Sequence, residues 1–544
     1  MFKLNNIPVK VKDITFIAVA TLLLSVPSGF TADHFAKVMF VGSFLQTFAY
    51  TIPLAALTAR STLWRNVALS MIVVLFALEV YVFTKLGCRI NANILSLILQ
   101  TNANEAWEYL NLHVLSIGFF ISIITIAAAT TAICVFINKL NAVAFTIGKK
   151  SIIATAVVLA LFIAYTWMPK FAPIGKNSIH NLVNSMGFVV DSHNDIAQYE
   201  QMIDRIEITH YPDSNQSPAI VLIVGESFNR NHSNLYGYPL NTQPRLKAEA
   251  DSGNLLVFTN CTTPSLSTNK CIKFLFTHSR CTSADEDKET SHIIMPAVFR
   301  RAGFRVSYLD NQYTRTFCQY TDFTCGYFLN PPKINDACFD VRNDELCPYD
   351  GDFVDRYSDE IQTAPGTLSI IHIMGQHFDS SQRYPEEFDA FHADDIDRRD
   401  LSESQREQVA QYDNATLYND YTIAKIIDRY RNSDAVIIYI ADHGEQIYDG
   451  PNHYFGRGFL CSFYDDEPYD NIFRIPVMIW MSPTFSARHS DAALRLRNAV
   501  DRQFCSDDLP YLLYDLAGID FNYNDKSRSL INDLYIPHKT IIAD

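Results

Sequence analysis

The sequence predicts an α-helical transmembrane domain followed by a soluble α/β domain. Three observations support this: apolar stretches before residue 170, a change of charge near that residue, and alternating strand-like and helix-like segments after residue 217. Residues 1–170 contain 12 Lys/Arg and 5 Asp/Glu, whereas the remainder contains 32 and 54, which gives the net charge of −15. An acidic soluble half argues against nucleic acid as a partner.

The N-terminal half contains five apolar stretches of the length needed to cross a bilayer. A hydrocarbon core about 30 Å thick requires roughly 20 apolar residues in a helix. We expect the first stretch to be retained rather than cleaved as a signal peptide, because further spans follow it. The predicted spans are about residues 13–30, 35–59, 64–86, 112–137 and 151–168.

Basic residues in the short loops orient these spans, because such residues favour the cytoplasmic side. With a cytoplasmic N-terminus, five crossings place everything after Trp167 outside the cytoplasm. An outer loop at about 86–111 then mixes apolar residues with amides and carboxylates. It either faces the soluble domain along the membrane surface or is an amphipathic connector without chemistry. The orienting residues are Lys3, Lys10, Lys12, Arg60, Arg65, Lys139, Lys149 and Lys150.

Cysteine spacing in the soluble half agrees with an oxidising compartment. Nine of the 11 cysteines follow residue 260, and there is no Cys-x-x-Cys pair of the zinc-finger type. Metal binding or inert thiols would be the usual interpretation in a reducing cytosol, but a domain delivered across a membrane favours disulfides. Nine is an odd number, so at least one thiol is free or pairs outside the chain. The candidate pairs are Cys261/Cys271, Cys318/Cys325 and Cys338/Cys347.

The soluble half has the pattern of a parallel sheet with helices on both faces. Residues 1–170 form the membrane domain, residues 171–217 are expected to be a linker, and residues 218–544 form the soluble domain. In open α/β sheets, ligands bind beyond the carboxyl ends of the strands. The polar residues that follow each strand are therefore candidates for a site. The clearest strands are 219–224, 306–309, 367–373 and 435–440.

Two of these strand ends carry metal-binding side chains. Glu226 follows the first strand, and Asp442 with His443 follows the fourth. Carboxylates and an imidazole suit Zn²⁺ and leave a coordination position for a reacting group. The alternative for the Asp-His pair alone is a helix cap with an ordinary buried histidine. The two strand ends together favour the metal site.

A hydroxyl-rich turn at 262–271 leads into the apolar run 272–276 and is the expected source of a nucleophile. A bound zinc ion would lower the pKa of a threonine hydroxyl, which is otherwise a poor nucleophile at neutral pH. His377 and His453 each follow or lie in a Gly-containing turn and suit a second metal or a phosphate, or a structural role equally well. His372 lies inside a predicted strand and is expected to be a core histidine. Physical reasoning leaves five hydroxyls open: Thr262, Thr263, Ser265, Ser267 and Thr268.

Taken together, the motifs resemble those of the membrane-anchored phosphoethanolamine transferases of Gram-negative bacteria, in the alkaline phosphatase and sulfatase-like superfamily. The resemblance covers nearly the whole chain and includes the five spans. It implies a sulfatase-like α/β catalytic domain. The matching segments are Leu99–Glu105, Val224–Ser227, Asn234–Tyr238, His372–His377 and Asp442–Glu445.

The resemblance also assigns roles to residues. In the family, the nucleophilic threonine lies nine residues before a small hydroxyl residue that closes an apolar run, and counting back from Thr277 selects Thr268. The implied ligands of one zinc ion, with a second ion possible, are Glu226, Thr268, Asp442 and His443. Histidines implied at the substrate phosphate, or at a second zinc ion, as acid or base are His377 and His453. Further implied substrate contacts are Asn311, Arg315, Asn102 and Glu105. Cys261/Cys271 and Cys338/Cys347 resemble family disulfides.

The activity implied is transfer of phosphoethanolamine from phosphatidylethanolamine, through a threonine intermediate, to lipid A or a lipopolysaccharide core. The implied protein is a monomer in the bacterial inner membrane with a periplasmic catalytic domain. Alternatives are a transferase acting on periplasmic glucans or transferring glycerophosphate, and a phosphatase or sulfatase. The Cys/Ser-x-Pro-x-Arg context of sulfatases does not occur around Thr268. A catalytically dead receptor or scaffold is a further alternative, which the intact set of candidate site residues opposes.

Overall fold

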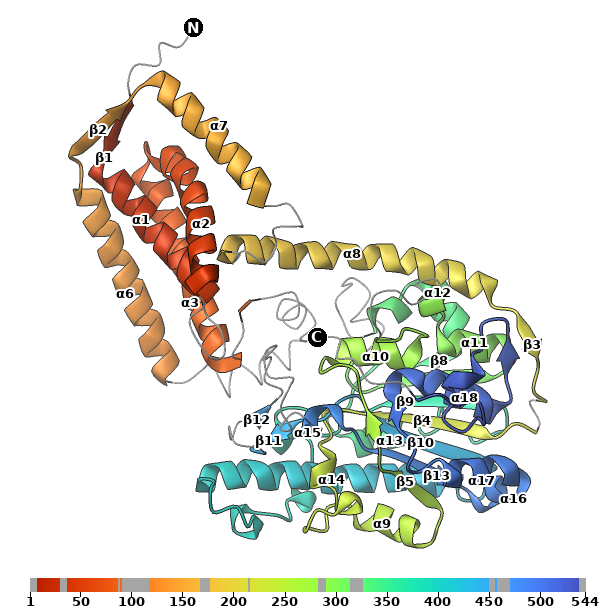
Figure 1. Cartoon of the computed structure of the whole chain (residues 1–544). Coiled ribbons are helices and arrows are strands. Elements are labelled where there is room, and N and C mark those ends of the chain that lie inside the picture. Colours follow the sequence, from red (N-terminus) through yellow and green to blue (C-terminus); the bar gives the residue numbers. More distant parts are fainter. Residues whose placement is uncertain are drawn as a thin grey trace. The chain divides into compact units, whose positions relative to one another are not determined.

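The computed structural model shows a chain that folds into two compact units, one of residues up to Val190 and one from Asp191 onward (Figure 1). The boundary lies inside the segment predicted to be a linker. The described residues are 7–29, 37–86, 89–90, 117–166, 177–213, 216–281, 290–313, 326–449, 455–456 and 470–537.

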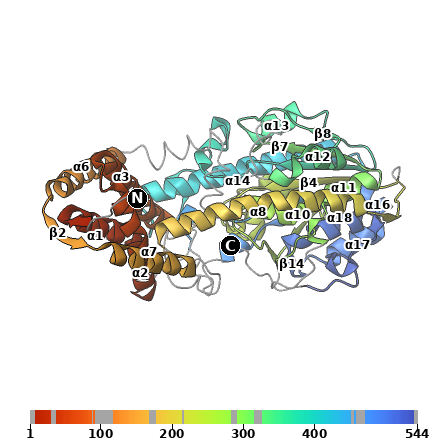
Figure 2. The same cartoon turned by 90° about the horizontal axis from the view of Figure 1, so that it is seen from above.

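The first unit contains a helix at the position of each predicted span. Helix α1 packs against α2, α3 and α6, and α7 packs against α2 (Figure 2). Two segments, Val11–Gly29 and Thr62–Thr84, are long and apolar enough to cross a membrane by length and composition. Five crossings remain a prediction. The five helices are α1 (Val11–Ser25), α2 (Lys37–Thr58), α3 (Thr62–Leu86), α6 (Ile117–Lys139) and α7 (Lys149–Thr166).

The N-terminal end of this unit is closed by a two-stranded ribbon, in which β1 (Ile7–Lys10) pairs antiparallel with β2 (Val143–Ile147). Arg65, expected in a loop, lies in α3 with its side chain buried. Its Nη2 atom donates to Asp13 Oδ1 at 2.6 Å. Arg65 is therefore a paired helix residue and not a free loop cation, because Asp13 neutralises it across the bundle.

The predicted linker is mostly helical, since α8 spans Ser178–Arg205 and is followed by β3 (Ile208–His210). Its Asn, Asp and Ser residues indicated a loop. Apolar residues nevertheless recur at helical spacing at Ile179, Leu182, Val183 and Met186, and this pattern places them on one face of a helix. For this segment, the helical spacing of its apolar residues is a better predictor than its polar composition.

The second unit is built on a seven-stranded sheet with the order β5-β13-β10-β4-β9-β7-β8. The four predicted strands are confirmed and lie next to one another in parallel. The expectation of a fully parallel sheet is wrong at one edge, because β13 runs antiparallel to both of its neighbours. The strands are β4 (Ala219–Gly225), β5 (Leu255–Phe258), β7 (Arg305–Asp310), β8 (Val341–Arg342), β9 (Thr367–His372), β10 (Ala435–Ala441) and β13 (Val477–Met481).

Helices cover both faces of this sheet, as the sequence predicts (Figure 1). Strands β4, β9, β10 and β13 are buried along their whole length, which agrees with the apolar runs of β4, β10 and β13. One face carries α9 (Pro244–Asp251) and α14 (Glu403–Tyr430). The other carries α10 (Thr268–Phe276), α11 (Met295–Arg301), α12 (Pro332–Cys338) and α18 (Leu509–Ala517).

Short elements complete the unit. The small strand pairs join β6 (Cys261–Thr262) to β14 (Phe504–Cys505), β11 (Gln446–Ile447) to β12 (Phe455–Gly456), and β3 to β15 (Asp520–Phe521). The remaining helices are α13 (Asp350–Arg356), α15 (Asp470–Phe473), α16 (Pro483–Arg488) and α17 (Ser490–Asn498).

A buried arginine ties the C-terminal segment to the residues that follow α10. Arg528 donates to Asp508 Oδ1 at 2.5 Å and to the carbonyl oxygen of His278 at 3.1 Å. Its guanidinium group also lies 4.2 Å from the centre of the Tyr511 ring. Asp508 is fully buried, so its charge depends on partners inside the protein.

We expect Arg528→Met to lower the free energy of unfolding of this unit by about 3–5 kcal/mol, because the variant leaves a buried carboxylate without its main partner. The measurement is urea denaturation of the full chain in detergent. Arg356→Met is the control, since the Arg356–Glu345 pair is largely solvent-exposed and should contribute little to stability. Equal losses in the two variants would contradict the assignment.

Candidate metal centre

The sheet brings the two predicted metal-binding strand ends together. Strands β4 and β10 are parallel neighbours, and Gly225 is paired in register with Ala441. The next residues, Glu226 and Asp442, therefore leave the sheet side by side. Gly225 must be glycine, because a Cβ atom there would lie 2.0 Å from the Tyr439 hydroxyl oxygen.

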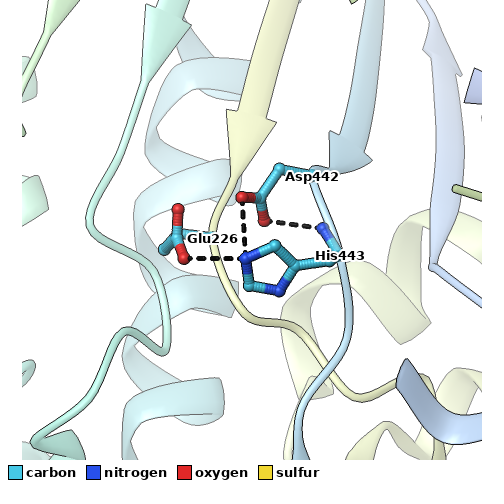
Figure 3. Close-up of side chains that lie close together, drawn as sticks. All are labelled: Glu226, Asp442 and His443. Atoms are coloured by element: carbon cyan, nitrogen blue, oxygen red, sulfur yellow. Dashed lines mark hydrogen bonds and ion pairs between the residues drawn. The ribbon is translucent and has the colours of Figure 1, made fainter. Parts of the chain in front are cut away.

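Glu226, Asp442 and His443 form a fully buried cluster in which one ligand atom of each lies within 4.8 Å of the others (Figure 3). His443 Nε2 lies 3.3 Å from Glu226 Oε1 and 3.1 Å from Asp442 Oδ2. The structure thus places three of the four predicted zinc ligands around one point.

Thr268, the first residue of α10, brings the fourth candidate ligand to the same point. Its Oγ1 atom lies 3.1 Å from Glu226 Oε2, 3.3 Å from Glu226 Oε1 and 3.2 Å from His443 Nε2. Of the five hydroxyls that physical reasoning left open, the Thr268 hydroxyl is therefore the one placed at the cluster by its hydrogen-bond distances to Glu226 and His443. Thr263 and Ser265 are fully buried elsewhere, and Thr263 Oγ1 lies beside the Cys271 and Ser506 side chains.

Hydrogen bonds fix the ligand atoms so that lone pairs face one another. His443 Nδ1 must carry its proton, because it lies 2.8 Å from the Gly444 carbonyl oxygen, which can only accept. Nε2 is then a lone-pair donor to a metal. Asp442 Oδ1 accepts from the backbone N–H groups of Ser227 and His443. Within the described part of the chain, the buried Asp442 Oδ2 atom has no hydrogen-bond partner.

This arrangement requires a cation. Asp442 Oδ2 and His443 Nε2 present lone pairs to a buried point beside the Glu226 carboxylate. The hydroxyls of Thr268 and of Ser227, which donates to Glu226 Oε1 at 2.8 Å, can each supply only one proton there. Burial, together with the nearby Glu226 carboxylate, raises the pKa of Asp442 above its usual range. A metal ion would remove this repulsion.

The geometry suits zinc. A tetrahedral site with metal–ligand distances of about 2.0–2.1 Å has ligand–ligand distances of about 3.3 Å. The distances from His443 Nε2 to the nearest oxygens of Thr268, Glu226 and Asp442 are 3.1–3.3 Å. Oxygen and imidazole donors are also the ligands that zinc accepts, and the Nδ1 hydrogen bond of His443 is the usual support for a zinc-binding histidine.

The turn after β9 packs directly against the cluster. Gly375 adopts a φ of 51°, and a Cβ atom there would lie 3.0 Å from the backbone of Glu226. Asp350 holds this turn by accepting the N–H groups of Met374 and Gly375. His377 ends the turn, is half-buried, and has Nδ1 2.7 Å from the Phe378 carbonyl oxygen. It lies outside the three-residue ligand cluster.

Asn311, expected to contact substrate, is part of the scaffold. Its side chain is buried, donates to Asp350 Oδ1 at 2.9 Å and accepts from the Cys347 N–H at 2.8 Å. Both polar atoms thus have partners inside the protein, and the substrate role expected for Asn311 stays a prediction. The expectations for Arg315, His453, Asn102 and Glu105 lie outside the described residues.

Sequence reasoning missed two residues behind Glu226, Asp310 and Gln312, and the link of His372 to the site. Gln312 Nε2 lies 3.2 Å from Glu226 Oε2 and 3.0 Å from His372 Nε2, and His372 Nδ1 lies 3.1 Å from Asp310 Oδ1. His372 is the satisfied core histidine that we expected, but its partners connect it to the site. Asp310 and Gln312 lie at the carboxyl end of β7, where ligands bind in open α/β sheets, so the same rule could have identified them.

Two predicted disulfides are absent from the described residues. Cys261, Cys338 and Cys347 are free thiols, and the Cys271 thiol lies 3.2 Å from the Ser265 carbonyl oxygen. The Cys338/Cys347 pair was predicted from its short spacing in the sequence, and this prediction is wrong. Cys338 is buried at the end of α12, whereas Cys347 is half-buried beside Asn311. Burial raises the pKa of Cys261 and Cys338, which makes both thiols unreactive. Cys318 and Cys325 lie outside the described residues.

Comparison with known proteins shows the family to which the chain belongs. A sequence model of the sulfatase family matches residues 218–519, more than half of the chain, and the chain belongs to this family. Phosphoethanolamine transferase EptC of Escherichia coli (strain K12) is 27% identical over 486 residues, which cover 82% of this chain and 78% of that protein. The resemblance that the sequence motifs predicted is confirmed.

Two solved structures extend the comparison. The C-terminal periplasmic domain of EptC from Escherichia coli, in complex with Zn, has a TM-score of 0.52 and 26% identity, covering 62% of this chain and 92% of that chain. The integral membrane protein lipooligosaccharide phosphoethanolamine transferase A from Neisseria meningitidis has a TM-score of 0.64 and 18% identity, covering 95% and 96%. The second likeness shows that both units share their fold with a membrane protein.

Proposed function

We propose that this chain is a zinc-dependent enzyme that transfers phosphoethanolamine from phosphatidylethanolamine to an envelope glycolipid, either lipid A or a lipopolysaccharide core. The observation that carries the proposal is the position of the Thr268 hydroxyl, 3.1–3.3 Å from Glu226 and His443 in a buried carboxylate–imidazole cluster. The relationship to EptC supports the choice of the transferred group.

The reaction follows from the positions of these residues. Glu226, Asp442, His443 and Thr268 would hold the zinc ion, which lowers the pKa of the threonine hydroxyl and offsets phosphoryl charge when bound. The Thr268 hydroxyl would give up its proton to solvent when zinc is bound. Its Oγ1 atom then forms a bond to the donor phosphorus, and the bond from phosphorus to the diacylglycerol oxygen breaks. His377 or His453 protonates that oxygen. An acceptor oxygen then attacks the phosphothreonine, its proton passes to the same histidine, and Thr268 is released.

The membrane unit has a place in this proposal. Both the donor and the acceptor are lipids, so a catalytic unit attached to membrane helices meets them at the bilayer surface. We propose a multi-pass protein of the inner membrane with five crossings, a cytoplasmic N-terminus and a periplasmic catalytic unit. The two apolar helices and the likeness to an integral membrane transferase support this topology.

The test is mass spectrometry of lipopolysaccharide and of the purified enzyme from Gram-negative cells that do or do not express the chain. We expect a phosphoethanolamine mass on lipid A or the core only in expressing cells, and the same mass on the peptide that contains Thr268. A phosphoethanolamine mass on periplasmic glucan instead would change the acceptor. A glycerophosphate mass, or no added mass on enzyme, lipid or glucan, would contradict the proposed transfer.

A further inference from the structure

Glu226 is held from behind by a buried amide. Gln312, 3% exposed, lies just beyond the end of β7, and its Nε2 atom is 3.2 Å from Glu226 Oε2. The other carboxylate oxygen, Oε1, is the one that lies 3.3 Å from His443 Nε2. The Gln312 hydrogen bond therefore holds Oε2, while Oε1, which accepts from the Ser227 hydroxyl at 2.8 Å, lies on the side of His443.

The orientation of this amide is fixed by its neighbours. Gln312 Nε2 also lies 3.2 Å from the Ile373 carbonyl oxygen. Glu226 Oε2 and this carbonyl oxygen can only accept hydrogen bonds, so the NH₂ group must point toward them. His372 Nε2, 3.0 Å away, shares the two N–H donors as a third acceptor, and its Nδ1–H donates to Asp310 Oδ1 at 3.1 Å.

Asp310 is itself immobilised. Its Oδ2 atom accepts from the Tyr308 hydroxyl at 2.7 Å, and its Oδ1 atom accepts from the backbone N–H of Gln312 at 2.8 Å. Asp310 and His372 are buried and belong to neighbouring strands β7 and β9. The chain Asp310–His372–Gln312–Glu226 thus connects the ends of three adjacent strands through fixed side chains.

We propose that Gln312 is a positioning residue that aligns Glu226 for zinc and thereby strengthens zinc binding, with His372 and Asp310 fixing its amide. Partners of this kind around metal ligands affect affinity by about 10–100-fold. The inference rests on the zinc site of the proposed function and adds a residue outside the set of ligands.

The experiment measures zinc affinity of the full chain in detergent, after removal of metal with a chelator, by titration against a chromophoric competitor. We expect Gln312→Met, which keeps the length of the side chain without its donor, to weaken zinc binding by about 10–100-fold. Gln312→Glu, which keeps the shape but places a second carboxylate beside Glu226, should weaken it further.

Gln376→Met is the matched control. Gln376 is also a buried glutamine next to Glu226, but its side chain contacts Thr416 Oγ1 at 3.3 Å. Its backbone N–H donates to the Glu226 carbonyl oxygen, and the substitution keeps this bond. The control variant should bind zinc within about threefold of the wild type, whereas a general loss of packing would affect both variants alike.

The outcomes separate the inference from the zinc site itself. Wild-type affinity in Gln312→Met, or equal weakening in Gln376→Met, would overturn the role of Gln312 and leave the zinc site intact. A wild-type chain that binds no zinc would overturn the site. Thermal unfolding of the metal-free proteins shows whether each variant is folded. If Gln312→Met is unfolded, the zinc affinity of Gln312→Glu is compared with that of the wild type, and an unchanged affinity would overturn the role of Gln312.

Discussion

Thr268→Ala is expected to lower the rate of phosphoethanolamine transfer by at least about 1000-fold, because the variant removes the atom that bonds to phosphorus. Thr268 is half-buried at the first position of α10, and its Oγ1 atom lies 3.2 Å from His443 Nε2, so removal of these few side-chain atoms should leave the helix and the sheet unchanged. Transfer is measured by mass spectrometry of glycolipid from cells that express each variant at equal level.

Thr262→Ala is the control for this substitution. Thr262 lies in the same hydroxyl-rich segment, but its Oγ1 atom is 3.4 Å from the Phe504 carbonyl oxygen in the β6–β14 pair. We expect its transfer rate to stay within about threefold of the wild type. Thr268→Ala should also lack the covalent phosphoethanolamine on its active-site peptide. More than a tenth of wild-type transfer in Thr268→Ala would reject Thr268 as the nucleophile.

Asp442→Asn is expected to weaken zinc binding by more than about 100-fold, beyond the loss typical of residues that only support a ligand. The asparagine keeps an oxygen for the N–H groups of Ser227 and His443, which Asp442 Oδ1 accepts. It removes the negative charge at Oδ2, the buried atom without a hydrogen-bond partner among the described residues. The substitution therefore tests metal binding, because it keeps the hydrogen bonds that Asp442 accepts from the backbone.

In the absence of metal, Asp442→Asn should not lower the stability of the protein. Asp442 and Glu226 are buried carboxylates whose charges repel, as the raised pKa of Asp442 indicates. We expect the metal-free variant to be at least as stable as the metal-free wild type in thermal unfolding, whereas zinc should stabilise only the wild type strongly. Asp420→Asn, a buried aspartate that accepts from the Leu246 N–H, is the matched control. Unchanged zinc affinity in Asp442→Asn would refute the metal site.

Much of the site could be predicted from local sequence. Strands β4 and β10 appear as apolar runs because buried parallel strands need side chains that pack on both faces. Glu226 and the Asp442-His443 pair follow these runs directly, and ligand sites form at such strand ends. The choice of Thr268 required the family spacing, because the segment from 262 to 268 contains several hydroxyls of similar chemistry.

Other features depended on contacts between distant parts of the chain. Which strands are neighbours, and that Gly225 pairs in register with Ala441, is set by packing of the whole sheet. For the same reason Asn311 is in the scaffold while the next residue, Gln312, reaches Glu226. Cysteine spacing did not predict pairing, because the direction of each side chain depends on the element that carries it.

The sequence by itself therefore determined the types of element, the candidate ligand residues and the family, since these follow from periodicity, composition and motifs within short segments. The tertiary structure decided which of these residues meet, that the expected linker contains α8, and that Asp310, His372 and Gln312 lie behind Glu226. The physical reason is that a metal centre needs atoms a few ångströms apart, and only the folded sheet brings distant segments that close.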